Sequence, residues 1–209
     1  MKSRAMPGGN WGCVRLRPSS YPNRLNPEHS HIGHIAKLFL AFEMYTAMTE
    51  LHIVRAGEQD REAAFQIVEE YNNAVSVMVR DSPESFAKDY FQSGAGLWLA
   101  QSGTQLVGCI ALRPLHTHQQ AGEIKRLYVR PEFRGSGAAL ALLDALERYA
   151  KASGYRWLYL DSKDDLQAAL RFYRRQGYEA CEPYNQNPQA TVFMRKALDS
   201  EAGLQQSTG

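Results

Sequence analysis

The sequence predicts a single α/β domain between about residues 48 and 198. Segments with the two-residue period of a β-strand alternate with amphipathic segments of helical period, and glycine or proline separates most of them. The chain has 209 residues, of which 44% are apolar and 22% charged, as in an ordinary soluble globular protein. This length and composition allow one domain with a sizeable core.

The first half of the domain is expected to contain a strand, two helices and a β-hairpin. Residues 51–53 begin the strand, and Asp60 is expected to cap the amphipathic helix that follows. Ser82-Pro83 predicts the start of a second helix, because serine caps a helix and proline fits its first position. Residues 97–101 and 106–112 then alternate like two strands around a polar turn, which indicates a hairpin.

The second half is predicted to run strand, helix, strand, helix and two final strands. Gly154 and Gly177 are expected to end the two helices, since glycine accepts the left-handed conformation found there. Ser162 and Asp165 resemble a capping box at the start of the second of these helices. The predicted ranges are 123–129, 139–150, 156–160, 166–173, 178–181 and 191–194.

A glycine turn, Arg134-Gly135-Ser136-Gly137-Ala138-Ala139, joins the strand that ends at Val129 to the helix that follows. The first N–H groups of a helix have no partners within it, and the helix dipole favours a negative charge there. Glycine also lets the main chain approach a phosphate closely, because it has no Cβ. The turn therefore predicts a site for a phosphate or a pyrophosphate.

The residues around this turn separate three kinds of nucleotide site. A P-loop requires Gly-Lys-Ser/Thr, whereas Gly137 is followed by two alanines, so this class is excluded. A dinucleotide site fits Gly135 and Gly137, and Asp161 closes the next strand as that fold requires. Against it, Leu140 stands where a third small residue belongs, and the turn lies too far beyond Val129. A dinucleotide-dependent oxidoreductase stays open as an alternative.

The third kind of site is one for coenzyme A, and here residues 122–178 resemble the cofactor-binding half of the GNAT family of N-acetyltransferases. The family's turn, Arg/Gln-x-x-Gly-x-Gly/Ala, is matched by Arg134, Gly137 and Ala139. Residues 169–178 resemble the family's Ala-x-x-x-Tyr-x-x-x-Gly-Phe/Tyr signature. The resemblance implies a central mixed, mostly antiparallel sheet flanked by helices.

Two details qualify the resemblance. Many members carry Asn seven residues before the signature tyrosine, whereas this chain has Leu166, so some cofactor contacts must come from elsewhere. This departure keeps a second alternative open, a catalytically silent acyl-CoA-binding module. Residues 125–131 and the loop 184–188 resemble a bacterial branch of the family whose substrate is undefined.

The resemblance implies transfer of the acetyl group of acetyl-CoA to an amine, which attacks the thioester directly. The acceptor is expected to be a small-molecule or peptide amine, and no metal is expected. The turn and Arg134 would hold the pyrophosphate, the strand edge would hold the pantetheine arm, and the Leu127 N–H would stabilise the oxyanion. The predicted cofactor-binding residues are Leu127, Tyr128, Val129, Arg134, Gly135, Ser136, Gly137, Ala138, Ala139 and Leu140.

Two residues are candidates for proton transfer. Glu123 lies eleven residues before Arg134, the spacing of the glutamate that is the base in some family members. Its structural interpretation is a strand-end carboxylate paired with a neighbouring Arg or Lys. Tyr173 of the signature is the candidate acid, although a tyrosine on an apolar helix stripe otherwise indicates core packing. Candidates for acceptor recognition are Tyr71, Phe86, Tyr90, Arg113 and the Tyr184–Pro188 loop.

Both ends of the chain are expected to lie outside the folded domain. Residues 1–47 are interpreted as a disordered or non-core extension with a short amphipathic helix from Ile35, which makes Met48 a candidate start of the domain. Residues 199–209 are interpreted as a flexible tail. A polar tail gives a metal no rigid geometry, so no metal cluster is expected at His29, His31 and His34.

Composition and cysteine usage also bear on partners and location. A net charge of +2 gives no indication of nucleic acid, and we expect no such partner. The most apolar run, residues 35–48, is short and broken by Lys37 and Glu43, so no membrane partner is expected. Three scattered cysteines and the lack of an apolar leader favour a cytoplasmic location. A homodimer is left open.

Overall fold

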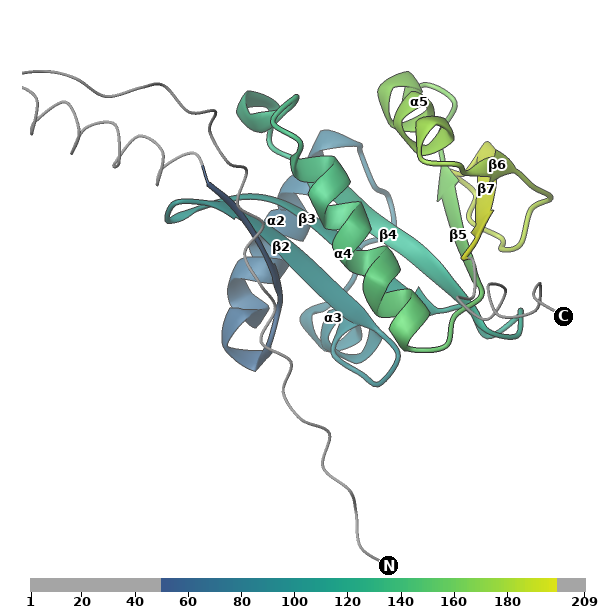
Figure 1. The fold of residues 1–209 in the computed structure, drawn as a ribbon, viewed down its shortest axis with the longest axis horizontal. Coiled ribbons are helices and arrows are strands. Elements are labelled where there is room, and N and C mark those ends of the chain that lie inside the picture. Colours follow the sequence, from purple (N-terminus) through teal and green to yellow (C-terminus); the bar gives the residue numbers. More distant parts are fainter. Residues whose placement is uncertain (1–49, 199–209) are drawn as a thin grey trace, which may run out of the picture.

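The computed structural model describes residues 50–198. It contains one seven-stranded sheet with helices on both faces (Figure 1). The strands are β1 (Leu51–Arg55), β2 (Gly96–Ser102), β3 (Gln105–Pro114), β4 (Ala121–Val129), β5 (Trp157–Ser162), β6 (Glu179–Ala180) and β7 (Val192–Ala197). The helices are α2 (Arg61–Ala74), α3 (Pro83–Tyr90), α4 (Ala138–Ala152) and α5 (Gln167–Arg175), with short 3-10 turns η1 (Glu58–Asp60) and η2 (Pro131–Phe133).

The sheet has the strand order β1-β2-β3-β4-β5-β7-β6. Every neighbouring pair is antiparallel except β4 and β5, which run parallel and are connected through α4. The predicted mixed α/β fold class and the predicted order of elements are therefore confirmed.

Alternation along β2 and β3 divides the core into two layers, because successive strand residues face opposite sides of a sheet. Leu97 and Leu99 of β2 pack with α2 and α3, together with Cys109 of β3. Trp98 and Ala100 face the opposite side and pack with α4. Figure 1 shows α4 crossing one face of the sheet, with α2 and α3 behind it. Since both faces are covered, these strands are apolar almost throughout.

The predicted N-terminal caps of the helices are confirmed in one case and wrong in two. Ser82 caps α3, since its hydroxyl oxygen accepts the Ser85 N–H at 3.2 Å, and Pro83 takes the first helical position. Asp60 precedes α2 but makes no capping bond to it; its carboxylate instead accepts the Gly57 N–H at 2.9 Å.

The predicted capping box at residues 162–165 is also wrong. Ser162 is the last residue of β5 and pairs with Val192 of β7, so the sheet extends over the position expected to cap a helix. Helix α5 begins later, after Leu166, and no side chain caps it.

The expected extension 1–47, its histidines and amphipathic helix, and the tail 199–209 lie outside the described residues. Within residues 50–198, none of the helices is both long enough and apolar enough to cross a membrane.

Candidate active site

A large cavity opens where β4 and β5 part. The two strands pair only over residues 121–123 of β4 and 157–159 of β5. Beyond Glu123, β4 separates from β5, and a cavity of about 1220 Å³ lies along its free edge. The N-terminal end of α4 and one side of α5 complete the wall. Because the sheet is interrupted here, main-chain groups of β4 face the cavity instead of another strand.

A kink in β4 lies beside this cavity. Arg126 has φ of +58°, in the left-handed region that residues other than glycine seldom adopt. The β3–β4 register shifts at the same place, between Cys109 and Ala111. The Cys109 thiol donates to the Arg126 carbonyl at 3.2 Å, which helps to hold the distorted backbone.

The direction of the N–H groups on β4 follows from its pairing with β3. Residues of an antiparallel strand alternate in the edge to which they direct their N–H groups. Arg130 donates its N–H to the Val107 carbonyl of β3 at 2.9 Å. By this alternation, Val129 and Leu127 direct theirs to the opposite edge, along the cavity. The Val129 carbonyl also faces that edge, since it accepts a hydrogen bond from Nε of Arg134 at 3.3 Å.

The glycine turn lies at the end of the cavity where α4 begins. Gly135 and Gly137 have φ of +84° and +88°, so both need the conformational freedom of glycine. A Cβ built on either would meet nothing within 4 Å, which means that open space lies above the main chain.

The N–H groups of the turn differ in how far they are engaged. Ser136 donates to the Phe133 carbonyl at 3.3 Å, and Ala138 donates to the Ser136 hydroxyl at 3.4 Å. Among the described residues, no hydrogen bond takes up the N–H groups of Gly135, Gly137, Ala139 or Leu140. The turn therefore presents free donors to open space at a helix N-terminus, which suits the pyrophosphate of a coenzyme A.

Tyr173 of α5 lines the same cavity and is 6% exposed. Its ring lies between those of Phe172 and Tyr178, each in edge-to-face contact at 5.4 Å between centroids. Burial raises the pKa of Tyr173 above that of a free phenol, and the nearby Tyr71 and Asp161 act in the same direction. The hydroxyl is therefore protonated at neutral pH and can donate a proton.

Glu123 is placed differently, and its contacts are those of a structural carboxylate. It is 2% exposed and is not among the residues that line the cavity. One oxygen accepts Nε of Arg113 at 2.7 Å. The other contacts Lys125, the Tyr184 hydroxyl and the Asn185 amide, each at 3.1 Å. Arg113, Lys125 and Asn185 do line the cavity, so Glu123 lies directly behind its wall.

The other part of the cavity is closed by two segments that are distant in the sequence. Gln189, in the loop between β6 and β7, accepts the Met78 N–H at 2.9 Å and donates to the Ser76 carbonyl at 3.1 Å. Lys163 adds a hydrogen bond of 3.1 Å to the Val75 carbonyl. These bonds tie residues 75–78, between α2 and α3, to the far side of the cavity.

Several cavity residues were missed by the sequence reasoning. Arg126 pairs with Asp81 at 2.7 Å, and Lys125 pairs with Asp161 at 2.9 Å. Two adjacent basic residues within a strand were a usable signal for a site. The contact made by Gln189 left no local signal. Of the residues considered for acceptor recognition, Tyr71 and Arg113 line the cavity, whereas Phe86 and Tyr90 are buried in the core.

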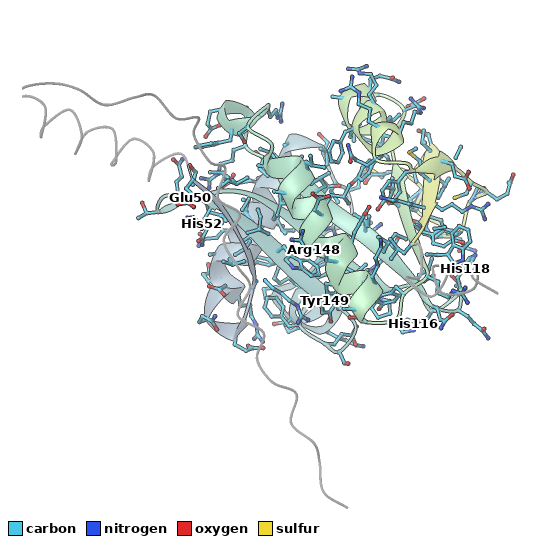
Figure 2. All side chains as sticks on the ribbon, in the orientation of Figure 1. Glu50, His52, His116, His118, Arg148 and Tyr149 are labelled. Carbon is cyan, nitrogen blue, oxygen red and sulfur yellow. The ribbon has the colours of Figure 1, made fainter. Side chains whose placement is uncertain are left out.

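The histidines of the described chain take no part in this cavity. Figure 2 labels His116 and His118 at the far end of α4 from the glycine turn. Both are exposed, and His118 packs its ring against Tyr159. Within residues 50–198, no group of three or more His, Cys, Asp or Glu side chains is arranged to hold a metal ion.

The family to which the chain belongs follows from a comparison with family models. The model described as the Acetyltransferase (GNAT) family matches residues 60–178, which is more than half of the chain. The chain belongs to the Acetyltransferase (GNAT) family. The match runs from the start of α2 to the end of the signature that contains Tyr173, so it includes the glycine turn and most of the cavity wall.

Relatives of this GNAT protein occur in several kingdoms. An uncharacterized N-acetyltransferase of Schizosaccharomyces pombe is 40% identical over 96 residues, 46% of this chain and 58% of that protein. An IAA acetyltransferase of Azospirillum brasilense is 35% identical over 101 residues, covering 47% and 64%. N-acetyltransferase 8 of Mus musculus is 30% identical over 113 residues, which are 52% of this chain and 50% of that protein. A match to a bacterial branch in particular is therefore not confirmed.

Solved structures support the fold. An acetyltransferase of the GNAT family from Staphylococcus aureus has a TM-score of 0.61 and 19% identity, covering 71% of this chain and 99% of that one. PaiA N-acetyltransferase of Thermoplasma acidophilum, solved in complex with coenzyme A, has a TM-score of 0.57 and 18% identity, covering 70% and 98%. The comparisons support neither a dinucleotide-dependent oxidoreductase nor a silent acyl-CoA-binding module.

Proposed function

We propose that this GNAT protein transfers the acetyl group of acetyl-CoA to an amine, which attacks the thioester directly. One observation carries the proposal. A glycine turn with free N–H donors, a strand edge with unpaired main-chain groups and a protonated tyrosine all face the same cavity. Acetyl-CoA, when bound, supplies an activated acyl group on a sulfur that leaves as a thiolate.

The turn and the edge of β4 would hold the cosubstrate. Free N–H groups of Gly135, Gly137, Ala139 and Leu140, at the positive end of the α4 dipole, would bind the pyrophosphate. Arg134 extends from the same turn and would add a charge-assisted contact to a phosphate. Main-chain groups of residues 127–129 would bind the amide groups of the pantetheine arm as a strand binds its neighbour.

Two groups of the chain would assist the chemical step. The Leu127 N–H would stabilise the negative charge that develops on the carbonyl oxygen, a kind of contact worth about 10²–10³ in rate. The Tyr173 hydroxyl would give its proton to the departing sulfur. Burial makes this phenol a weaker acid than a free tyrosine, so its proposed role rests on the place of Tyr173 in the cavity wall and not on its pKa.

Glu123 is proposed as the final proton acceptor for the incoming ammonium, acting through the cavity wall. Its carboxylate does not face the cavity, so the proton has to pass through an intermediate group. Lys125 contacts Glu123 at 3.1 Å and lines the cavity, so its ammonium could give a proton to the carboxylate while it takes up the proton that the incoming amine loses. Glu123→Gln keeps the shape and tests the charge: amine-dependent turnover should fall, while the affinity for acetyl-CoA stays unchanged.

The proposed function is tested by release of free thiol from acetyl-CoA. Small amines, amino acids, polyamines, aminoglycosides and peptides with free N-termini form the acceptor panel. Amine-dependent release is expected with at least one class. Binding of acetyl-CoA without release across the whole panel would instead favour a silent acyl-CoA-binding protein. A cytoplasmic location and a homodimer stay predictions.

A further inference from the structure

The part of the cavity beyond the β4 edge holds several charged side chains that the acceptor can meet. Arg113, Arg126, Asp81 and Asp161 all line it. These side chains come from β3, from β4, from the segment before α3 and from the end of β5. Which of them still have free donors or acceptors determines what kind of amine the cavity can recognise.

The oxygens of Asp161 are already occupied. One accepts the Lys125 ammonium at 2.9 Å. The other accepts the side-chain amides of Asn185 at 2.8 Å and Asn187 at 3.0 Å. Glu123 behind the wall is likewise surrounded by four partners of its own. Both carboxylates are thus engaged mainly by side chains of the protein itself.

Arg126, by contrast, has unused hydrogen-bonding capacity. Its Nη2 donates to Asp81 at 2.7 Å, and the Tyr71 ring lies 5.6 Å from its guanidinium carbon. Its Nε is buried without a hydrogen-bond partner, and its Nη1, which is not among the buried atoms, also donates no hydrogen bond within the described residues. A buried donor without a partner is costly, so such a group indicates a ligand that supplies the missing acceptor.

Arg113 adds a second incomplete set of donors. Its Nε pairs with Glu123 at 2.7 Å and its Nη1 with Asp89 at 3.1 Å. Among the described residues, Nη2 donates no hydrogen bond; the side chain is 35% exposed and lines the cavity. Two arginines with free donors therefore give this part of the cavity a place to bind an anionic group.

We propose that the amine acceptor also carries a carboxylate, which Arg126 binds with the help of Arg113. This inference rests on the proposed function. The planar guanidinium matches the two oxygens of a carboxylate better than it matches a neutral amide. Asp81 has one oxygen without a partner among the described residues, so the cavity can also attract the ammonium of the same molecule. Val75, Val77 and Val79 line the cavity nearby, which favours an amino acid with an apolar side chain.

The first test compares three acceptors that share a ring and an amine: phenylalanine, phenylalaninamide and phenethylamine. Rates of thiol release are expressed per concentration of free-base amine, because the three amines differ in pKa. We expect kcat/KM to be about 10- to 100-fold higher for phenylalanine, as expected for a hydrogen bond to a charged group. Equal values for all three, in a protein that acetylates them, would overturn the inference and leave the proposed function intact.

The second test compares Arg126→Lys with a matched control. Arg130→Lys alters an arginine that follows the same strand, pairs with Glu70 and does not line the cavity. Arg126→Lys should abolish the preference for phenylalanine over its amide while leaving the affinity for acetyl-CoA unchanged. Arg130→Lys should retain the preference. Retention in both variants would contradict the assignment to Arg126.

A binding measurement separates failure of the inference from failure of the proposed function. Calorimetry on the wild-type protein compares N-acetylphenylalanine with N-acetylphenylalaninamide and needs neither turnover nor a variant. We expect at least about tenfold tighter binding of the carboxylate, the effect of one charge-assisted hydrogen bond. If no amine releases thiol, the proposed function fails, yet this difference still supports or refutes the carboxylate site. Equal affinities, or no binding of either compound, would refute it.

Discussion

Gly137→Ala tests the glycine turn, and the same helix offers a matched control. Gly137 precedes α4 and Gly154 follows it, with φ of +88° and +84°. A Cβ built on either glycine meets nothing within 4 Å. Both substitutions therefore force alanine into the left-handed region without a clash. They differ in that only Gly137 lines the cavity.

The two variants should lose similar stability but differ in ligand affinity. The left-handed conformation costs a non-glycine residue about 1–2 kcal/mol. This corresponds to a fall in Tm of roughly 2–8 °C for a domain of this size. At Gly137 the new methyl group also occupies the space proposed for a phosphate. Affinity for acetyl-CoA should fall by at least about tenfold, the effect of one weakened charge-assisted hydrogen bond.

The assay is calorimetric titration of acetyl-CoA together with thermal unfolding. Gly154→Ala should bind acetyl-CoA like the wild-type protein. Gly137→Glu should show no measurable binding, because its carboxylate adds a repulsive negative charge at the same place. Unchanged affinity in both Gly137 variants would refute the assignment of the turn as the pyrophosphate site.

Three further predictions concern single groups. Tyr173→Phe should lower kcat by about 10²–10⁴-fold, which is the contribution of a positioned general acid. Its affinity for acetyl-CoA should not change. Wild-type turnover across the pH range would exclude Tyr173 from the mechanism. Glu123→Gln should lower turnover. The Tm of this variant should also fall, because Arg113 and Lys125 lose their charged partner. Full activity would exclude a role of Glu123 as base. The third prediction concerns pH. Burial acts to raise the pKa of Asp161, but Lys125 and the two asparagines outweigh it and hold the pKa below its usual value. The stability that Asp161 contributes is therefore present above its unfolded pKa of about 3.9 and is lost as the pH falls through the lower folded value. The free energy of unfolding, measured with urea, should fall less steeply below about pH 4 in Asp161→Asn than in the wild-type protein. Equal slopes of this free energy against pH would contradict the prediction.

Much of the fold could be predicted because local pattern and tertiary structure agree. Leu97 to Ala100 form an apolar run bounded by glycine and polar residues, and both faces of that strand are in fact covered. The glycine turn was predicted for a related reason. Gly135 and Gly137 need their residue type for their own backbone conformation, whatever surrounds them.

The features that could not be predicted depend on contacts between distant segments. Ser162 has the residue type of a helix cap, but pairing with β7 keeps it in a strand. The left-handed conformation of Arg126 could not be predicted, because it lies where the pairing of β4 with β3 shifts register. Gln189 meets Ser76 across more than one hundred residues of sequence.

The most direct test of the central claim is thiol release from acetyl-CoA, combined with mass spectrometry of the acceptor. The wild-type protein and Gly137→Glu are assayed side by side across the amine panel. The account predicts amine-dependent release and an acetylated amine with the wild-type protein, and neither with Gly137→Glu. Amine-dependent release that persists in Gly137→Glu, or a wild-type protein that neither binds acetyl-CoA nor releases thiol, would contradict it.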